Sequence, residues 1–415
     1  MDQRVDFLSS SVWDETIYER MRWLREHDPV HWSATTGPRG AWVLSKYADV
    51  AYVSKHNKLF CSGQGVRPGN PAKLTLIDED PPRHTRVRGL INKGFTPRMV
   101  QKLEEGFRTT VTDTIDAVGV RGACDFVADI AVPLPLLLIA DMIGIERRDR
   151  DRFHRWSDAL IASDGNMDNP AIVAEASRAF MEYSAYLTDI FADRRAHPRD
   201  DLVSILVGAK DDGVLGQADR DLPMATSEEH ARLANDELIM ILVLLLVAGN
   251  ETTRNGISGG MHLLLEHPGE RRKLLDDPSL IPAAVEEMVR LVSPVRSFGR
   301  TATEDTELRG RRIKQGDSLL MLYPSANRDA EHFDDPDAFR VERRPEHLGF
   351  GIGQHFCLGA NLARMEMRVA FTEILRRLPD MTLACDRPEI KPSALVHSYM
   401  HMPVRFTPER EAAAS

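Results

Sequence analysis

Cysteines are few in this sequence and long apolar runs are missing, and each absence excludes a class of protein. The cysteines stand far apart, without a Cys-x-x-Cys spacing (Cys61, Cys124, Cys357 and Cys385). This scatter argues against a disulfide framework and a zinc site, and it favours a reducing, cytoplasmic setting. The longest apolar stretch covers 238–249, which is shorter than the roughly 20 residues that a membrane-spanning helix needs.

Positive charge, a secretion signal and linkers are missing as well. A formal net charge of -10 argues against nucleic acid as a general partner, because phosphate binding needs a basic surface. Residues 1–20 carry acidic side chains and no apolar core, so no signal peptide is expected. No Ser/Gly run, repeat or block of like charge divides the 415 residues. We therefore expect a single domain over 1–415, long enough to bury a cofactor.

The order of apolar patterns predicts a mainly helical fold with small sheets. Helical spacing marks four regions (14–27, 82–209 with breaks at Pro97, Pro133 and Pro170, 236–265 and 278–291), and one more helix follows 348. A hairpin is expected over 30–46 and further strands over 299–323. The polar or Gly-rich stretches 61–73 and 210–235 are expected to form loops.

One glycine-rich run, 350–359, surrounds the most informative cysteine. Cys357 lies among glycines, which allow tight turns and the close approach of a bulky group. An apolar, helix-forming stretch follows, and the unpaired N–H groups at its start would favour the thiolate form of the sulfur. Such a sulfur could serve as a nucleophile, a zinc ligand or an axial ligand of haem iron. The haem alternative alone requires a single cysteine in a Gly-rich loop with a phenylalanine upstream.

The apolar segment 238–247 ends abruptly in polar residues. It is apolar on every side, so as a helix it must be buried. Glu251, Thr252 and Thr253 follow, and an acid and two hydroxyls at the end of a buried helix are costly unless they are paired or used. A helix that leaves the core and carries Glu251 and Thr253 into solvent explains them equally well.

The run around Cys357 resembles the haem-ligand signature of the cytochromes P450, Phe-x-x-Gly-x-(His/Arg)-x-Cys-x-Gly. Every defined place is filled, by Phe350, Gly353, His355, Cys357 and Gly359. The resemblance implies the cytochrome P450 fold and a bound haem b (iron protoporphyrin IX) held by the Cys357 thiolate. It also implies a monooxygenase that inserts one oxygen atom of O2 into a C–H bond. The thiolate would push electron density that favours O–O cleavage.

The same resemblance gives the polar end of the apolar segment a role. Residues 248–253 match the family's Ala/Gly-Gly-x-(Asp/Glu)-Thr-Thr run. Ala248 would then lie against the haem. Thr252 would hold dioxygen by a hydrogen bond, and Glu251 would relay protons from solvent toward it.

Glu287 and Arg290 stand three residues apart, on one face of a predicted helix. Such spacing most often gives a surface ion pair that contributes only about 0.3–0.5 kcal/mol. The two residues also precede Cys357, in the order found in the P450s, and in this they resemble the buried structural pair of that family. Its third member would be Arg343, with Arg340 and Arg344 as alternatives. This group would support the haem loop and take no part in the chemistry.

Haem carries two propionate carboxylates that need hydrogen-bond donors. By the family resemblance the donors would be His84, Arg88, Arg300 and His355, with Arg296 as the alternative to Arg300. Phe350, at the start of the loop, would add an apolar contact to the cofactor.

The segments that line the substrate pocket in this family are mostly apolar here. The resemblance assigns them Val66, Leu76, Val243, Leu244, Val295, Phe298 and Val396, with Arg67, Arg296 and His397 as polar contacts. A hydrophobic small molecule is therefore the expected substrate. Ordinary core packing explains most of the apolar residues equally well.

Short runs along nearly the whole chain resemble the actinobacterial P450s that hydroxylate the side-chain end of cholesterol and cholest-4-en-3-one. These runs are 65–68, 124–127, 155–158, 200–204 and 249–254. The likeness ends at 213–230, where this chain has an acidic insert. The alternative is a P450 that hydroxylates a fatty acid, terpenoid or polyketide in secondary metabolism.

Electrons would come from NAD(P)H through a separate ferredoxin and ferredoxin reductase, because the chain has neither a flavin domain nor an iron–sulfur cysteine pattern. Arg364 and Arg368 could dock such a partner or simply form a solvated helix face. A peroxide-driven peroxygenase and a non-catalytic haem sensor or carrier are the rival activities. The pair Glu251 and Thr252 argues against both, because it serves the protonation of O2.

Overall fold

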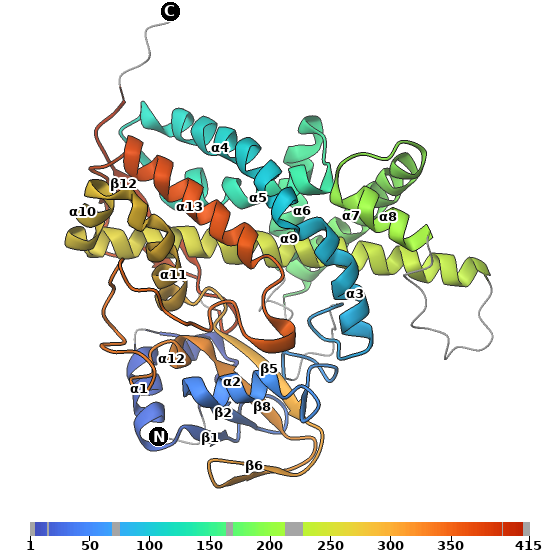
Figure 1. Ribbon diagram of the computed structural model, residues 1–415, viewed down its shortest axis with the longest axis vertical. Coiled ribbons are helices and arrows are strands. Elements are labelled where there is room, and N and C mark those ends of the chain that lie inside the picture. Colours follow the sequence, from blue (N-terminus) through green and yellow to red (C-terminus); the bar gives the residue numbers. More distant parts are fainter. Residues whose placement is uncertain are drawn as a thin grey trace, which may run out of the picture. The chain divides into compact units, whose positions relative to one another are not determined.

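The computed structural model describes residues 5–409, with gaps at 15, 69–74, 163–168, 212–226 and 392. Within these ranges the α-helices are α1 (Ile17–His27), α2 (Tyr47–Lys55), α3 (Arg83–Ile91), α4 (Pro97–Gly119), α5 (Pro133–Ile143), α6 (Arg150–Ala162), α7 (Pro170–Ala196), α8 (Leu202–Asp211), α9 (Ser227–Glu266), α10 (Pro268–Asp276), α11 (Ile281–Val292), α12 (Tyr323–Ala326) and α13 (Ala360–Arg377). The strands are β1 (Val30–Ser33), β2 (Ala41–Leu44), β3 (Phe60–Cys61), β4 (Ala123–Asp125), β5 (Ser297–Ala302), β6 (Thr306–Leu308), β7 (Arg311–Ile313), β8 (Ser318–Leu322), β9 (Thr382–Leu383), β10 (Glu389–Ile390), β11 (Tyr399–His401) and β12 (Pro403–Arg405). Figure 1 shows their arrangement, and the mainly helical prediction with small sheets is confirmed.

The chain packs into two compact units, neither of which is continuous in sequence. The first unit consists of Met1–Ala72, Glu104–Leu134 and Thr252–Ser415, and the second of Lys73–Leu103 and Pro135–Glu251. Helices α4 and α9 contribute residues to both units. A single domain over 1–415 stays a prediction.

The main sheet of the first unit joins strands from both ends of the chain. Its order is β1-β2-β8-β5-β3, in which β1 and β2 form the predicted hairpin and β2 runs parallel to β8. Both faces of β8 are buried. Leu319 and Met321 pack with α2, whereas Leu320 and Leu322 pack with α1. The alternation follows from the two-residue period of a strand, and it explains why β8 reads as a continuous apolar run.

Helices α11 and α13 pack closely against the part of α9 that belongs to the first unit. A Cβ on Gly259 would lie 2.7 Å from Val292, and one on Gly260 would lie 2.8 Å from both Met288 and Phe371. The absence of side chains at these two positions therefore lets α9 approach its neighbours. This packing supports α13, which begins directly after the Cys357 loop.

Proline opens three helices at the positions where breaks in the helical pattern were predicted. Helices α4, α5 and α7 begin at Pro97, Pro133 and Pro170, because a missing N–H costs nothing in the first turn. The Asn169 side chain also caps α7, accepting hydrogen bonds from the N–H groups of Ala171 and Ile172.

The prediction of a loop over 210–235 is wrong for its last part, because α9 begins at Ser227. That prediction relied on apolar periodicity, which is weak before 236. Residues 227–235 are polar, but they include good helix formers such as Glu, Ala, Arg and Leu. The acidic insert at 213–230 lies mostly outside the described residues. Over the described ranges, no helix is both long and apolar enough to cross a membrane.

Candidate functional site

Cys357 lies in a tight loop of the first unit, directly before α13. Its backbone N–H donates to the carbonyl of Phe350 at 2.8 Å, which closes the loop. Gly351 and Gly353 adopt φ angles of 67° and 79°, a left-handed conformation that strains other residues. A Cβ on Gly353 would also come within 2.7 Å of the Ser54 carbonyl oxygen. Two glycines of the run 350–359, one of them a defined place of the motif, are therefore required by the backbone itself.

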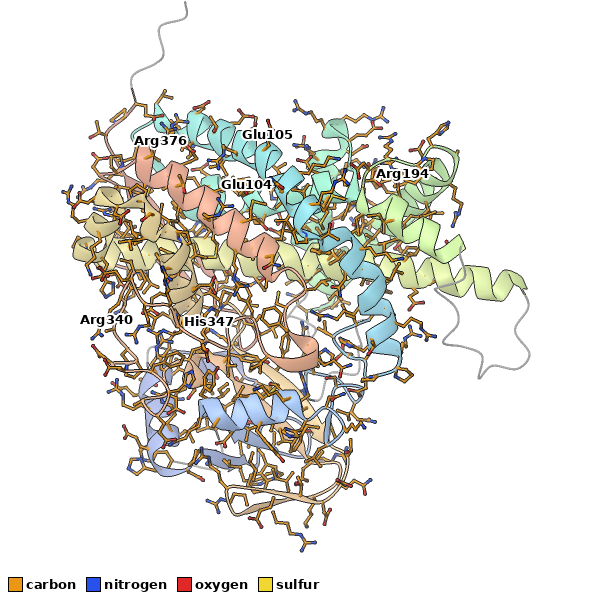
Figure 2. The ribbon with its side chains drawn as sticks, in the orientation of Figure 1. Glu104, Glu105, Arg194, Arg340, His347 and Arg376 are labelled. Carbon is orange, nitrogen blue, oxygen red and sulfur yellow. The ribbon has the colours of Figure 1, made fainter. Side chains whose placement is uncertain are left out.

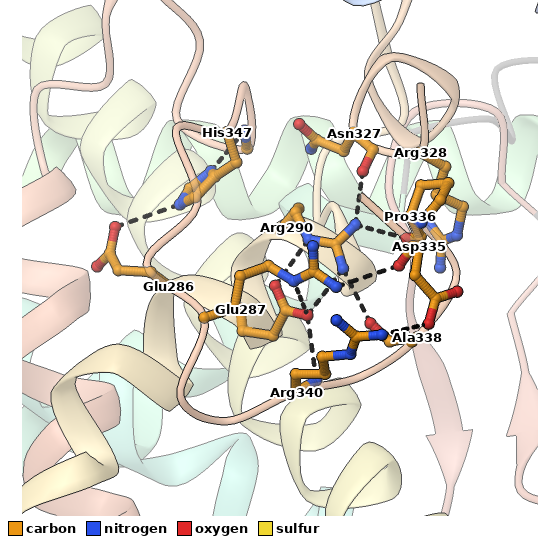
Figure 3. Close-up of polar contacts among 12 residues, drawn as sticks. Glu286, Glu287, Arg290, Asn327, Arg328, Asp335, Pro336, Ala338, Arg340 and His347 are labelled. Atoms are coloured by element: carbon orange, nitrogen blue, oxygen red, sulfur yellow. Dashed lines mark hydrogen bonds and ion pairs between the residues drawn. The ribbon is translucent and has the colours of Figure 1, made fainter. Parts of the chain in front are cut away.

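An ion-paired arginine holds the start of this loop against two helices. The Arg364 guanidinium of α13 lies 4.6 Å from the centre of the Phe350 ring and binds Glu286 of α11 through two hydrogen bonds of 2.7 and 2.8 Å. His347 also contacts Glu286, at 3.2 Å (Figure 3). Burial by itself would raise the pKa of Glu286, but these hydrogen bonds outweigh it and lower the pKa to about 2. The pKa of Arg364 is raised, mainly by its hydrogen bond to Glu286 and less by the charges of Glu286 and Cys357.

Because its pKa is lower in the folded chain than its usual 4.5, the Glu286 carboxylate stabilises the fold above about pH 4.5. This contribution is lost as the pH falls toward about 2. We expect Glu286→Gln to lower the free energy of unfolding at neutral pH, and the difference from wild type to shrink on acidification. Urea unfolding at a series of pH values measures it. Glu105→Gln removes an exposed carboxylate of α4 (Figure 2) and is the control. A difference that stays constant down to pH 3 would contradict the assignment.

Glu287 and Arg290 form a fully buried ion pair, with both side chains 0% exposed. The Arg290 Nε and Nη2 atoms donate to the two carboxylate oxygens at 2.7 and 2.8 Å. Arg343 also reaches Glu287, at 3.1 Å. Arg340, in contrast, turns its side chain to Asp335 (Figure 3). Arg290 donates further to three backbone carbonyls, those of Asn327, Pro336 and Ala338. The pair therefore ties α11 to the segment 327–343 that leads toward the Cys357 loop.

The residues of the first unit that were predicted to contact the haem propionates (Arg300 and His355) or dioxygen (Thr252) lie on three elements. Arg300 is buried on β5, and its guanidinium donates to the Gly299 carbonyl at 2.7 Å. His355, in the loop, shares a hydrogen bond of 3.1 Å with the Ser62 hydroxyl. Thr252 is half-buried on α9. Arg296, the alternative to Arg300, points elsewhere, because its guanidinium lies on the ring of Trp13.

The second unit carries the other predicted haem and proton-relay residues. His84 and Arg88 lie on α3, where His84 is only 1% exposed. On α9 Glu251 is 5% exposed, and so is Thr253 on the same helix. This burial contradicts the alternative in which the helix carries both residues into solvent. Ala248 is exposed on α9, although most residues just before it are buried.

Comparison with known proteins assigns the family. A cytochrome P450 family model matches residues 273–384. A steroid C26-monooxygenase of Mycolicibacterium smegmatis is 37% identical over 95% of this chain and 94% of that protein. The chain belongs to the cytochrome P450 family. A methyl-branched lipid omega-hydroxylase of Mycobacterium tuberculosis is also 37% identical, over 89% of this chain and 84% of that protein.

Solved structures agree with this assignment. Mycobacterium marinum cytochrome P450 CYP268A2, in complex with pseudoionone, matches with a TM-score of 0.84 at 34% identity, over 97% of this P450 and 98% of that chain. CYP109E1 of Bacillus megaterium, in complex with testosterone, matches with a TM-score of 0.80 at 30% identity, over 94% and 99%. This chain therefore has the cytochrome P450 fold and is a P450 monooxygenase.

The cofactor of this P450 is a haem-thiolate, as its family implies, and the described residues fit that group. Cys357 remains partly exposed at the surface of the first unit, and its loop has the glycines that close approach requires. Ala248 presents only a methyl group at an exposed point of α9 in the second unit. Each feature leaves room for a large flat group beside its own unit.

Some of the predicted pocket residues of the first unit are only half-buried, and some of them pack on its core. Val295 and Val396 pair through an isolated β-bridge, and the carbonyl of Val66 accepts the Gly299 N–H at 2.6 Å. Val295 and Phe298 are half-buried and pack partly on the core of the main sheet. Core packing therefore explains part of their apolar character.

In the second unit Val243 and Leu244 are buried on α9. Leu76 is buried too, but its backbone is unusual, with a φ of 60°. The Ile77 N–H donates to the Thr75 carbonyl across it at 2.7 Å, which makes Leu76 the centre of a strained three-residue turn. No sequence signal marks this turn, because nothing about a leucine favours a positive φ.

The arginines of α13, among them Arg376 (Figure 2), are ion-paired within the first unit. Arg368 binds Glu104 of α4 through two hydrogen bonds, of 3.1 and 2.7 Å, and Arg376 binds Glu373 at 2.7 Å. Arg364 is paired with Glu286, as described above. Local sequence patterns did not indicate the pairs with Glu286 and Glu104, because their partners lie far away in the chain.

Proposed function

We propose that this P450 hydroxylates the terminal carbon of a branched alkyl chain on a steroid, as in cholest-4-en-3-one. The observation that carries this proposal is the similarity to steroid C26-monooxygenases over almost the whole chain, at 37–40% identity. The methyl-branched lipid omega-hydroxylases at 37% identity favour a second candidate, a branched lipid oxidised at the same kind of carbon. Terminal oxidation of a branched chain is common to both.

The residues would divide the work as follows. Haem, when bound, supplies the redox chemistry that activates O2, and Cys357 would hold its iron. His84, Arg88, Arg300 and His355 would orient the cofactor through its propionates. On α9, Thr252 would hold dioxygen by a hydrogen bond and Glu251 would pass protons toward it. The buried Glu251 carboxyl lies next to the half-buried Thr252 hydroxyl on α9. This arrangement supports the two roles, because protons must pass from solvent to a site that excludes water.

We further propose a ferredoxin and its NAD(P)H-dependent reductase as the electron source, and a cytoplasmic location. The P450 class implies redox partners, and the chain offers no flavin or iron–sulfur motif of its own. The scattered cysteines and the lack of a membrane-spanning helix in the described ranges support the location.

A ligand screen followed by turnover tests the function. Steroids, branched lipids, fatty acids and terpenoids are titrated against the haem-loaded protein, and the spectral shift on ligand binding is recorded. We expect the C27 steroid ketone to give the tightest shift and a terminal alcohol as product with ferredoxin and reductase. A complete absence of shift with C27 steroids would reject the steroid proposal. Peroxide alone matching the ferredoxin-supported rate would reject the monooxygenase electron source.

The same assay tests the two α9 residues. In Thr252→Ala we expect NAD(P)H consumption to continue while product per NAD(P)H falls. Glu251→Gln should instead slow turnover by about 100-fold, the usual contribution of a proton-transfer group. Unchanged coupling in Thr252→Ala would refute the role given to this hydroxyl.

A further inference from the structure

Arg364 brings a positive charge to the Cys357 loop within the first unit. The residue lies near the start of α13, and its guanidinium packs 4.6 Å from the centre of the Phe350 ring. The Phe350 carbonyl accepts the Cys357 N–H at 2.8 Å, so the ring that Arg364 contacts and the cysteine belong to one closed loop. A guanidinium remains charged throughout the physiological pH range. Arg364 is therefore a permanent charge on the loop that carries the proposed haem ligand.

The charges of Arg364 and of the Cys357 sulfur also interact. The hydrogen bond to Glu286 is the main cause of the raised pKa of Arg364, and the negative charges of Glu286 and of the Cys357 thiolate raise it further. A Coulomb interaction is mutual, so the guanidinium stabilises negative charge on this sulfur as well. In a thiolate-ligated haem the sulfur passes electron density to the iron. The positive charge of Arg364 thus acts on the metal through its ligand.

Glu286 of α11 holds the guanidinium in this position. Its carboxylate accepts two hydrogen bonds from Arg364, at 2.7 and 2.8 Å. His347 Nε2 donates a third, at 3.2 Å (Figure 3). The tautomer of His347 is fixed, because the Gly349 N–H donates to Nδ1 at 3.0 Å and leaves the imidazole proton on Nε2. The carboxylate is thereby tied both to α13 and to the segment that enters the Cys357 loop.

We propose that Arg364 raises the reduction potential of haem bound to Cys357, and that Glu286 is the positioning residue that holds the guanidinium and offsets part of its charge. Reduction adds one electron from the proposed ferredoxin to the ferric iron, which makes the site more negative. A nearby positive charge favours the reduced state, and a nearby negative charge opposes it. The inference rests on the proposed function, in which Cys357 holds the haem iron, and it assigns the ion pair to the electron-transfer step.

The two charges of the pair are not equivalent toward the loop. Arg364 contacts the Phe350 ring directly, whereas the hydrogen bonds of the Glu286 side chain go to Arg364 and His347. The positive charge should therefore outweigh the negative one at the sulfur. Solvent reduces both effects, because the Arg364 and Glu286 side chains are 35% and 24% exposed. We expect each charge to change the equilibrium constant for reduction by about threefold, or roughly 30 mV for a one-electron couple.

A dye-coupled reductive titration of the haem-loaded, substrate-free protein measures the potential. Arg364→Gln should lower it, because the variant loses the positive charge and leaves Glu286 unpaired. Glu286→Gln should raise it, because the guanidinium then loses its negative neighbour. The double variant removes both charges, and its potential should lie between those of Arg364→Gln and wild type. Arg364→Lys keeps the charge without the paired hydrogen bonds and should stay near wild type.

Arg368→Gln is the matched control. Arg368 lies one turn further along α13, and its side chain is 36% exposed, close to the 35% of Arg364. It binds Glu104 of α4 through two hydrogen bonds, as Arg364 binds Glu286. Its guanidinium is thus paired toward α4 rather than toward the Cys357 loop. The potential of Arg368→Gln should differ from that of wild type by less than the potential of Arg364→Gln does.

The signs of the shifts distinguish a charge effect from a distorted loop. Equal potentials of Arg364→Gln and wild type would overturn the inference. Shifts of Arg364→Gln and Glu286→Gln in the same direction would overturn it too, because opposite charges must act in opposite directions. An Arg364→Lys potential as low as that of Arg364→Gln would assign the effect to packing and would also overturn it.

The reduced carbon monoxide complex separates these results from a failure of the proposed function. A wild-type complex without the red-shifted thiolate band would reject Cys357 as the haem ligand, and the inference would fall with it. A wild-type complex with the band but without the expected shifts would overturn the inference alone. Titrating only variants that show this band ensures that an unfolded protein is not counted.

Discussion

Cys357→Ser is expected to abolish the monooxygenase activity of this P450 while leaving its fold intact. Serine has nearly the same size as cysteine, so the hydrogen bond from the residue 357 N–H to the Phe350 carbonyl can persist. A hydroxyl, however, is a much weaker donor of electron density to iron than a thiolate. Turnover should fall below detection, and the reduced carbon monoxide complex should lose the red-shifted band that thiolate ligation produces.

Cys385→Ser is the matched control for this prediction. Cys385 lies in the first unit and is partly exposed, like Cys357, but it is outside the glycine-rich loop. The Cys385→Ser variant should keep both the red-shifted thiolate band and the monooxygenase activity. A Cys357→Ser protein that retained the thiolate band would show that another residue ligates the haem. Circular dichroism of both variants checks that neither substitution has unfolded the chain.

Glu287→Gln should destabilise the first unit by about 3–5 kcal/mol, the usual cost of removing one partner from a buried ion pair. The reason is specific to this site. Both side chains of the pair are 0% exposed, so the Arg290 charge would remain buried with fewer compensating oxygens. Arg343 would lose its contact to the same carboxylate as well. Urea or thermal unfolding followed by circular dichroism measures the loss.

Glu342→Gln is the corresponding exposed control. Glu342 pairs with Lys273 at 2.8 Å, but its side chain is 58% exposed, and such pairs contribute at most about 1 kcal/mol. If Glu287→Gln and Glu342→Gln lowered the free energy of unfolding equally, burial of an ion pair would not determine how much it contributes to stability. Glu287→Gln should also weaken haem retention, because Arg290 and Arg343 anchor the segment that leads toward the Cys357 loop.

Much of the fold followed from local chemistry. Proline marked the breaks at which α4, α5 and α7 begin, and the Gly-Pro-Arg-Gly run at 37–40 marked the turn of the β1–β2 hairpin. These signals are readable because they act over a few residues, through a missing N–H or a tight turn. The start of α9 was missed for the converse reason, since its first residues are helical by propensity and lack an apolar stripe.

The chemistry of the loop was also local, and the sequence by itself determined it. Cys357 and its glycines are adjacent in the chain, and the positive φ of Gly353 is a property of that position. Pairings between distant segments were decided only by the tertiary structure: the parallel contact of β2 with β8, the choice of Arg343 over Arg340 beside Glu287, and the placement of Arg296 against His397. In each of these pairings, residues far apart in the chain come into contact. Burial and backbone direction decide which of several similar arginines reaches a carboxylate, and no short sequence pattern encodes them.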